Sequence, residues 1–99
     1  MYEEIQKTEN STPHPTDLAP EHGMVFKTAD ETELADFWVL GTLPEPEVGK
    51  VIHLHWQQVK VTAVNTHYGR DEGSGRPLVF TTVTVEAHSS PAGTEAVSG

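Results

Sequence analysis

Apolar and polar positions alternate over most of the region between Met24 and Ala87, whereas both ends of the chain are polar. Successive side chains of a strand point to opposite faces of a sheet, so this alternation is typical of half-buried strands. The pattern predicts a folded domain over residues 23–87. An extended polar arm is predicted for residues 1–22, because its prolines disfavour helix interiors and central strands. A flexible tail is predicted for residues 88–99.

The body divides into apolar runs that are separated by turn-forming and charged residues. Five strands are predicted, over residues 24–29, 37–43, 50–56, 59–64 and 78–87. Asp30 and Glu33 stand in the positions of a capping box, so residues 30–36 are predicted to form one or two turns of helix. Gln57 and Gln58 are the predicted turn between the third and fourth strands. The connections are mostly short, which favours an all-β fold: a meander that curls into a small barrel or a two-layer sandwich.

The phase of each strand predicts which side chains enter the core. Val59, Val61 and Ala63 are predicted to face the core, and so is the face of the third strand that carries Ile52, Leu54 and Trp56. Met24, Phe26 and Thr28 share one face of the first strand, and Val79, Val83 and Val85 share one face of the last strand. Trp56 is assigned to the core because it is in phase with Ile52 and Leu54. Trp38 is out of phase with its apolar neighbours, and an outward-facing tryptophan is a common anchor of protein interfaces.

Two segments are candidate partner-binding sites. The strand over residues 37–43 is apolar on both faces, so Phe37, Trp38 and Leu40 are predicted to meet a partner. The loop over residues 65–77 is long for a hairpin connection, and long loops commonly carry function. Its basic side chains, Arg70 and Arg76, are the other predicted partner-binding residues.

Charge and cysteine content restrict the function further. The chain has 99 residues, a formal net charge of −9 and no cysteine. Thiol chemistry, disulfides and cysteine-held zinc are therefore excluded. The negative charge opposes binding to nucleic acid or anionic lipid and suits a basic protein surface. The first residues lack a signal sequence, and no apolar run is long enough for a transmembrane helix. We expect the protein to be located in the cytoplasm of a cell or of a virus-infected host. In the second case a location within the virion is also expected.

His53 and His55 are the clearest candidate metal ligands. Two histidines at positions i and i+2 of a strand project from one face and can chelate one ion, with His67, Asp71 or Glu72 as a third ligand. The interpretation as two exposed polar residues is favoured, because a complete zinc site needs three or four ligands. The sequence has neither a nucleophile elbow nor a phosphate-binding loop. We therefore expect no cofactor and no enzymatic activity.

Three functions remain open from the sequence. The favoured one is a non-enzymatic protein–protein interaction or structural assembly module, such as a virion accessory or joint protein, with a protein partner or a homo-oligomer. A domain this small often needs additional stabilisation, for which association is one source. The second is an acidic inhibitor that mimics nucleic acid through Asp30, Glu31, Glu33 and Asp36. The third is a metal-binding protein or metalloenzyme that uses His53 and His55.

Overall fold

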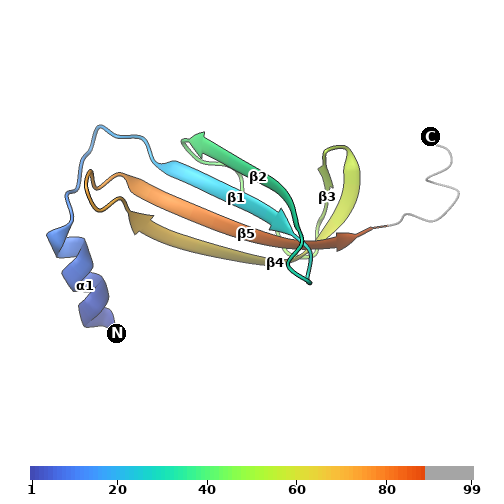
Figure 1. Ribbon diagram of the computed structural model, residues 1–99, viewed down its shortest axis with the longest axis horizontal. Helices are drawn as coiled ribbons and strands as arrows, with labels where there is room; N and C mark the ends of the chain where they lie inside the picture. Colours follow the sequence, from blue (N-terminus) through green and yellow to red (C-terminus); the bar gives the residue numbers. More distant parts are fainter. Residues whose placement is uncertain (89–99) are drawn as a thin grey trace, which may run out of the picture.

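The computed structural model describes residues 1–88, in which one helix precedes a single five-stranded sheet (Figure 1). The elements are α1 (Tyr2–Ser11), β1 (Glu21–Lys27), β2 (Glu33–Leu40), β3 (Val51–Leu54), β4 (Gln57–Arg70) and β5 (Pro77–Ala87). The sheet has the order β2-β1-β5-β4-β3 and curls until it is nearly closed into a barrel. The prediction of a small all-β fold with five strands is confirmed.

The strand pairing is not that of a complete meander. β1 and β2 form one antiparallel hairpin, and β3, β4 and β5 form an antiparallel meander. These two units are joined by a parallel pairing of β1 with β5, in which Met24 lies beside Thr81 and Phe26 beside Val83. The chain thus brings its first and last strands together at the centre of the sheet.

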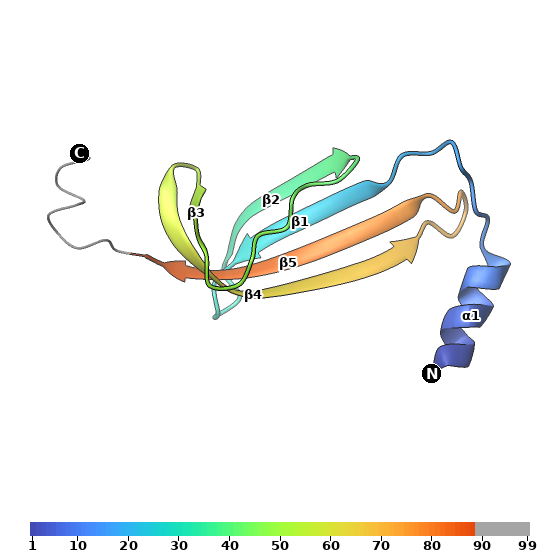
Figure 2. The ribbon, with the colours of Figure 1, turned by 180° about the vertical axis from the view of Figure 1, so that it is seen from behind.

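The core lies on the inner face of the curled sheet. Its buried apolar residues are Met24, Phe26, Val59, Val61, Val83 and Val85. Residues 41–50 cross over this face, behind the sheet in Figure 1 and in front of it in Figure 2. Ala63 was a predicted core residue and is instead exposed, because a β-bulge between Val61 and Ala63 shifts the register of β4. Such a bulge places the following side chain on the opposite face.

Residues 30–36 do not form the expected helical turn. The hairpin turn before β2 is closed by the Thr28 N–H, which donates to the Thr32 carbonyl oxygen at 2.9 Å. The Asp30 carboxylate accepts hydrogen bonds from Thr28 Oγ1 and from Thr32 Oγ1. The bond from Thr28, followed by those from Thr32, lowers the pKa of Asp30. Asp30 therefore stabilises a β-turn, and Glu33 begins a strand.

The turn between β3 and β4 lies two residues earlier than the sequence predicts. His55 and Trp56 occupy it with φ angles of 49° and 70°, and Leu54 pairs with Gln57. Trp56 lies in the turn and not in β3, so the alternation of side chains along the strand does not apply to it. Trp56 is 89% exposed, so its assignment to the core is wrong.

The N-terminal arm stands beyond the end of the sheet, as Figure 1 shows, but its first part is helical rather than extended. Glu3 and Glu4 lie in the first turn of α1, where the negative charge of acidic side chains interacts favourably with the helix dipole. The helix ends at Ser11, before the first proline of the arm, Pro13. The tail predicted for residues 88–99 lies outside the described residues except for His88.

Candidate interaction surface

The outer face of the sheet carries an exposed apolar patch, which we call the outer patch. Its members are Trp38 and Leu40 on β2, Gly23 on β1 and Phe80 on β5. Gly23 pairs with Trp38 on one side and with Phe80 on the other, so these residues form one row across the sheet. Trp38 is 59% exposed, Leu40 68% and Phe80 40%. An exposed apolar cluster is a candidate interaction site.

Gly23 determines how the Trp38 side chain lies. A Cβ atom on Gly23 would be 2.5 Å from Cε3 and Cζ3 of Trp38 and 3.1 Å from Cδ1 of Phe80. The indole therefore rests on the backbone of β1, in space that any other residue at position 23 would fill. Glycine inside a strand is typical of such close approaches.

A polar chain holds the indole in this orientation. Trp38 Nε1 donates to Glu21 Oε2 at 2.9 Å, and the other carboxylate oxygen of Glu21 lies 3.6 Å from Arg76 Nε. Arg76 Nη1 also donates to the carbonyl oxygen of Ala19 at 2.6 Å. Contacts within the chain thus fix the orientation of this aromatic surface.

The five predicted partner-binding residues do not form one site. Trp38 and Leu40 belong to the outer patch, and Arg76 reaches it through Glu21. Phe37 points to the inner face, where its ring lies 5.8 Å from that of Phe26 in an edge-to-face arrangement. Arg70 lies at the far end of β4 and contacts α1.

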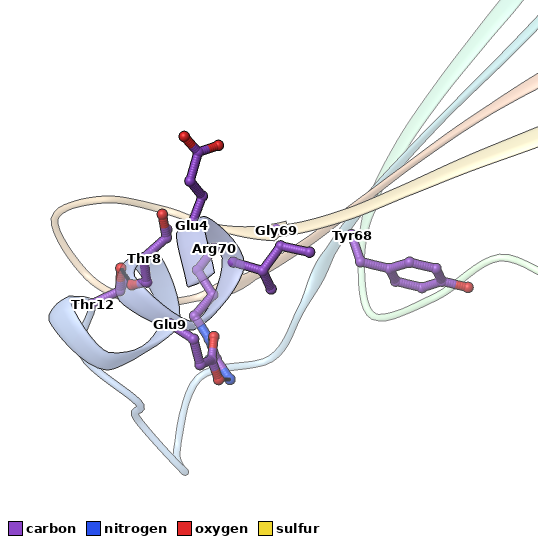
Figure 3. Close-up of a pocket in the computed structure, with 8 residues that line it drawn as sticks. Glu4, Thr8, Glu9, Thr12, Tyr68, Gly69 and Arg70 are labelled. Atoms are coloured by element: carbon purple, nitrogen blue, oxygen red, sulfur yellow. Dashed lines mark hydrogen bonds and ion pairs between the residues drawn. The ribbon is translucent and has the colours of Figure 1, made fainter. Parts of the chain in front are cut away.

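The Arg70 contact holds α1 near the sheet. Arg70 Nε and Nη2 donate to the two carboxylate oxygens of Glu9 at 2.9 and 3.0 Å (Figure 3). This bidentate bond lowers the pKa of Glu9 and raises that of Arg70. An open groove of about 350 Å³ lies between α1 and the end of β4, with Ile5 on one side and Tyr68 on the other. α1 itself has no buried residue.

A buried polar network fixes residues 41–50 over the inner face. The Leu43 N–H donates to His22 Nδ1 at 2.9 Å, so the proton of this imidazole is on Nε2, which donates to Thr81 Oγ1 at 2.9 Å. Thr81 Oγ1 lies 3.4 Å from Glu45 Oε2, which accepts a shorter bond of 2.6 Å from Thr66 Oγ1. No pattern in the sequence singled out His22.

The predicted metal ligands do not form a cluster of three within residues 1–88. His53 lies on β3, and His55 lies in the following turn, where its ring stacks on Phe37 with 6.2 Å between centroids. His67 lies on β4 beside Phe80, on the outer face. Within residues 1–88, no three His, Asp or Glu side chains are placed to hold a metal ion.

Three contributors to the outer patch were missed by the sequence analysis: Glu21, Gly23 and Phe80. Gly23 precedes the run of strand-forming residues that starts at Met24, so the strand pattern alone did not place it within a strand. Phe80 joins the patch only through the parallel pairing of β1 with β5, which no local pattern predicts. In the described part of the chain, no helix is long and apolar enough to cross a membrane. Comparison of the chain with protein-family models, curated proteins and solved structures found no match.

Proposed function

We propose that this protein is a non-enzymatic interaction and assembly module that binds a protein partner through the outer patch. The observation that carries the proposal is the fixed, exposed indole of Trp38, which lies in one row with Phe80 and beside Leu40. Tryptophan is enriched among the residues that dominate binding energy at interfaces. Glu21 holds the indole flat on the sheet. Such a preorganised side chain loses little conformational entropy when a partner covers it.

The balance of buried and exposed apolar residues supports the same function. Within residues 1–88, six apolar side chains are buried, whereas twelve large ones are exposed. A core of this size provides limited stability for a small domain. Covering the outer patch would remove more apolar surface from water and stabilise the fold.

The arm is a second contact element in this proposal. An isolated helix of ten residues is marginal in water, and α1 buries no side chain. Tyr2 and Ile5, which are both exposed, are available to pack against a partner that reaches the end of the sheet. We infer that an assembly component with such an arm acts in the cytoplasm of a cell or of a virus-infected host, or within a virion.

The acidic stretch supports an inhibitor function less well. Asp30 is bound by its own turn, and Glu31 pairs with Lys27 at 2.6 Å. These two acids therefore have local partners, and we do not carry the inhibitor or the metal hypothesis further.

Photocrosslinking tests the proposal. Phe80 is replaced by p-benzoylphenylalanine, and the control places the same residue at Thr84, on the same face of β5 but outside the patch. We expect irradiation in the native host extract to yield a protein adduct from position 80 that Trp38→Ala suppresses. Equal adducts from both positions, or none from position 80, would contradict the proposal.

A further inference from the structure

Among the described residues, β2 is an open edge of the sheet. It stands at one end of the strand order and has eight residues, whereas β3, at the other end, has four. Natural edge strands are usually short, charged or covered, because their free backbone groups pair with other chains. β2 has two exposed acids, Glu33 and Asp36, and a bulge at Leu34. It nevertheless carries four exposed large apolar side chains, those of Leu34, Phe37, Trp38 and Leu40. Trp38 and Leu40 lie on the outer face, and Phe37 lies on the inner face.

We propose that β2 pairs antiparallel with β2 of a second copy of this chain, with Phe37 at the twofold axis. The two sheets then form one continuous sheet. This inference rests on the proposed function and names a second copy of the chain as a partner. The proposed pairing uses the backbone edge of β2. It leaves the outer patch of each copy accessible. It also brings the two patches next to each other on one face of the joined sheet.

The free backbone groups of β2 lie where this pairing needs them. The Gly41 N–H donates to the Pro20 carbonyl oxygen at 2.6 Å, so it points toward β1. Backbone groups alternate in direction along an antiparallel strand. Asp36 and Trp38 therefore direct their N–H and C=O groups to the open edge, and these residues face each other across the proposed axis.

The side chains of β2 are complementary to themselves in this register. Leu34 lies opposite Leu40 of the second copy, and on the outer face Asp36 lies opposite Trp38 of the second copy. On the inner face, Phe37 meets its own equivalent. Pairs of large apolar side chains across strands stabilise a sheet, whereas like charges opposite each other destabilise it.

Neighbouring registers are less favourable for defined reasons. An axis at Asp36 would place two carboxylates opposite each other. An axis at Trp38 would leave Leu34 opposite Thr42, which lies beyond the end of β2. The register with its axis at Phe37 pairs residues 34–40 throughout and opposes no two acids. The net charge of −9 on each copy then acts only at longer range, where salt screens it.

Cysteine crosslinking tests the register directly, because the chain has no cysteine of its own. At the proposed axis the two residues 37 form a pair without mutual backbone hydrogen bonds, with Cα atoms about 4.5 Å apart. This lies within the disulfide range of roughly 4.4–6.8 Å. The control is Val39→Cys on the same face, where the two Cα atoms would be roughly 13 Å apart. We expect Phe37→Cys to form a disulfide dimer under mild oxidation, and Val39→Cys to remain mostly reduced.

A proline tests the backbone pairing without altering the β1–β2 hydrogen bonds. Asp36→Pro removes an N–H that points to the open edge, a position that proline tolerates in edge strands. Light scattering at physiological salt should show a dimer for the natural chain and for Asp36→Ala. The Asp36→Pro variant should be a monomer with an unchanged circular dichroism spectrum.

The outcomes separate this inference from the proposed function. A natural chain that is monomeric at every concentration and salt, or equal crosslinking at positions 37 and 39, overturns the β2 pairing. If position 80 still yields an adduct with another protein, the proposed function stands even though β2 does not pair with a second copy. If the chain is monomeric and position 80 yields no adduct, both fail. A dimer that persists in Asp36→Pro would show that another surface associates.

Discussion

The indole of Trp38 lies on the backbone of Gly23, and the nearest indole atoms are 2.5 Å from where a Cβ atom would be. The contact makes glycine necessary at this position through space alone, because the φ angle of Gly23 is not positive. The orientation of the main exposed aromatic residue of the protein therefore depends on the absence of one methyl group.

Gly23→Ala should displace the indole and break its 2.9 Å hydrogen bond to Glu21. We expect a loss of about 1–3 kcal/mol in the free energy of unfolding, as for other overpacked sites. Tryptophan fluorescence in a Trp56→Phe background should report a changed environment of Trp38. Gly69→Ala is the control, because nothing lies within 4 Å of the added Cβ atom. Equal effects of the two substitutions would disprove the role of Gly23.

Trp56→Gly should stabilise the protein relative to Trp56→Ala. Both variants remove the exposed indole, but only glycine relieves the left-handed backbone at φ = 70°. We expect a difference of about 1 kcal/mol in urea denaturation, which is the cost of that conformation for other residues. If the two variants unfold at the same urea concentration, the turn carries no strain.

The contact between Glu9 and Arg70 should depend on pH. The hydrogen bond from Arg70 lowers the pKa of Glu9 below its ordinary value of 4.5. The contribution of this bond is therefore complete above that value and is lost as the pH falls through the lowered pKa. We expect the NMR signal of the Arg70 Nε–H group to move toward that of a free arginine only at pH values below the ordinary pKa of a glutamate side chain. In the Glu9→Gln variant, the Arg70 Nε–H signal should not change with pH over the same acidic range. If the signal changes equally with pH in both proteins, Glu9 is not the group that Arg70 senses.

His22→Leu should destabilise the fold more than His22→Asn. Leucine leaves the partly buried Leu43 N–H without its acceptor at Nδ1, whereas the asparagine oxygen can take that position. An unsatisfied buried group costs about 1–3 kcal/mol. Urea denaturation of both variants measures the difference. Equal stabilities would mean that the hydrogen bond does not hold residues 41–50 in place.

Local patterns in the sequence predicted much of this fold, because strand periodicity acts over a few residues. Val59 and Val61 were assigned to the core, and both are buried. Met24 and Phe26 were placed on one face of their strand, as were Val83 and Val85, and all four are buried. Trp56 was misplaced because its phase is meaningful only while the chain remains a strand, and the turn begins at His55. The helical prediction for residues 30–36 failed because the acids of that segment found hydrogen bonds within a turn.

The N-terminal segment shows the same limit of local rules. The prolines restrict only the part of the arm from Pro13 onward, whereas the prediction applied their effect to all of residues 1–22. In the candidate site, the outward position of Trp38 could be predicted from β2 alone. The contribution of Phe80 could not, because it depends on the register between two strands at opposite ends of the domain.

The central position of β5 has a consequence for how the chain folds. β1 and β4 both pair with β5, and no pairing joins β1 directly to β4. Until residues 77–87 leave the ribosome, a nascent chain can form only two separate hairpins, and isolated two-stranded hairpins are marginally stable. Contacts between distant parts of a chain also slow folding. Co-translational folding should therefore occur in one late step, and a chain that ends before Pro77 should not form the core.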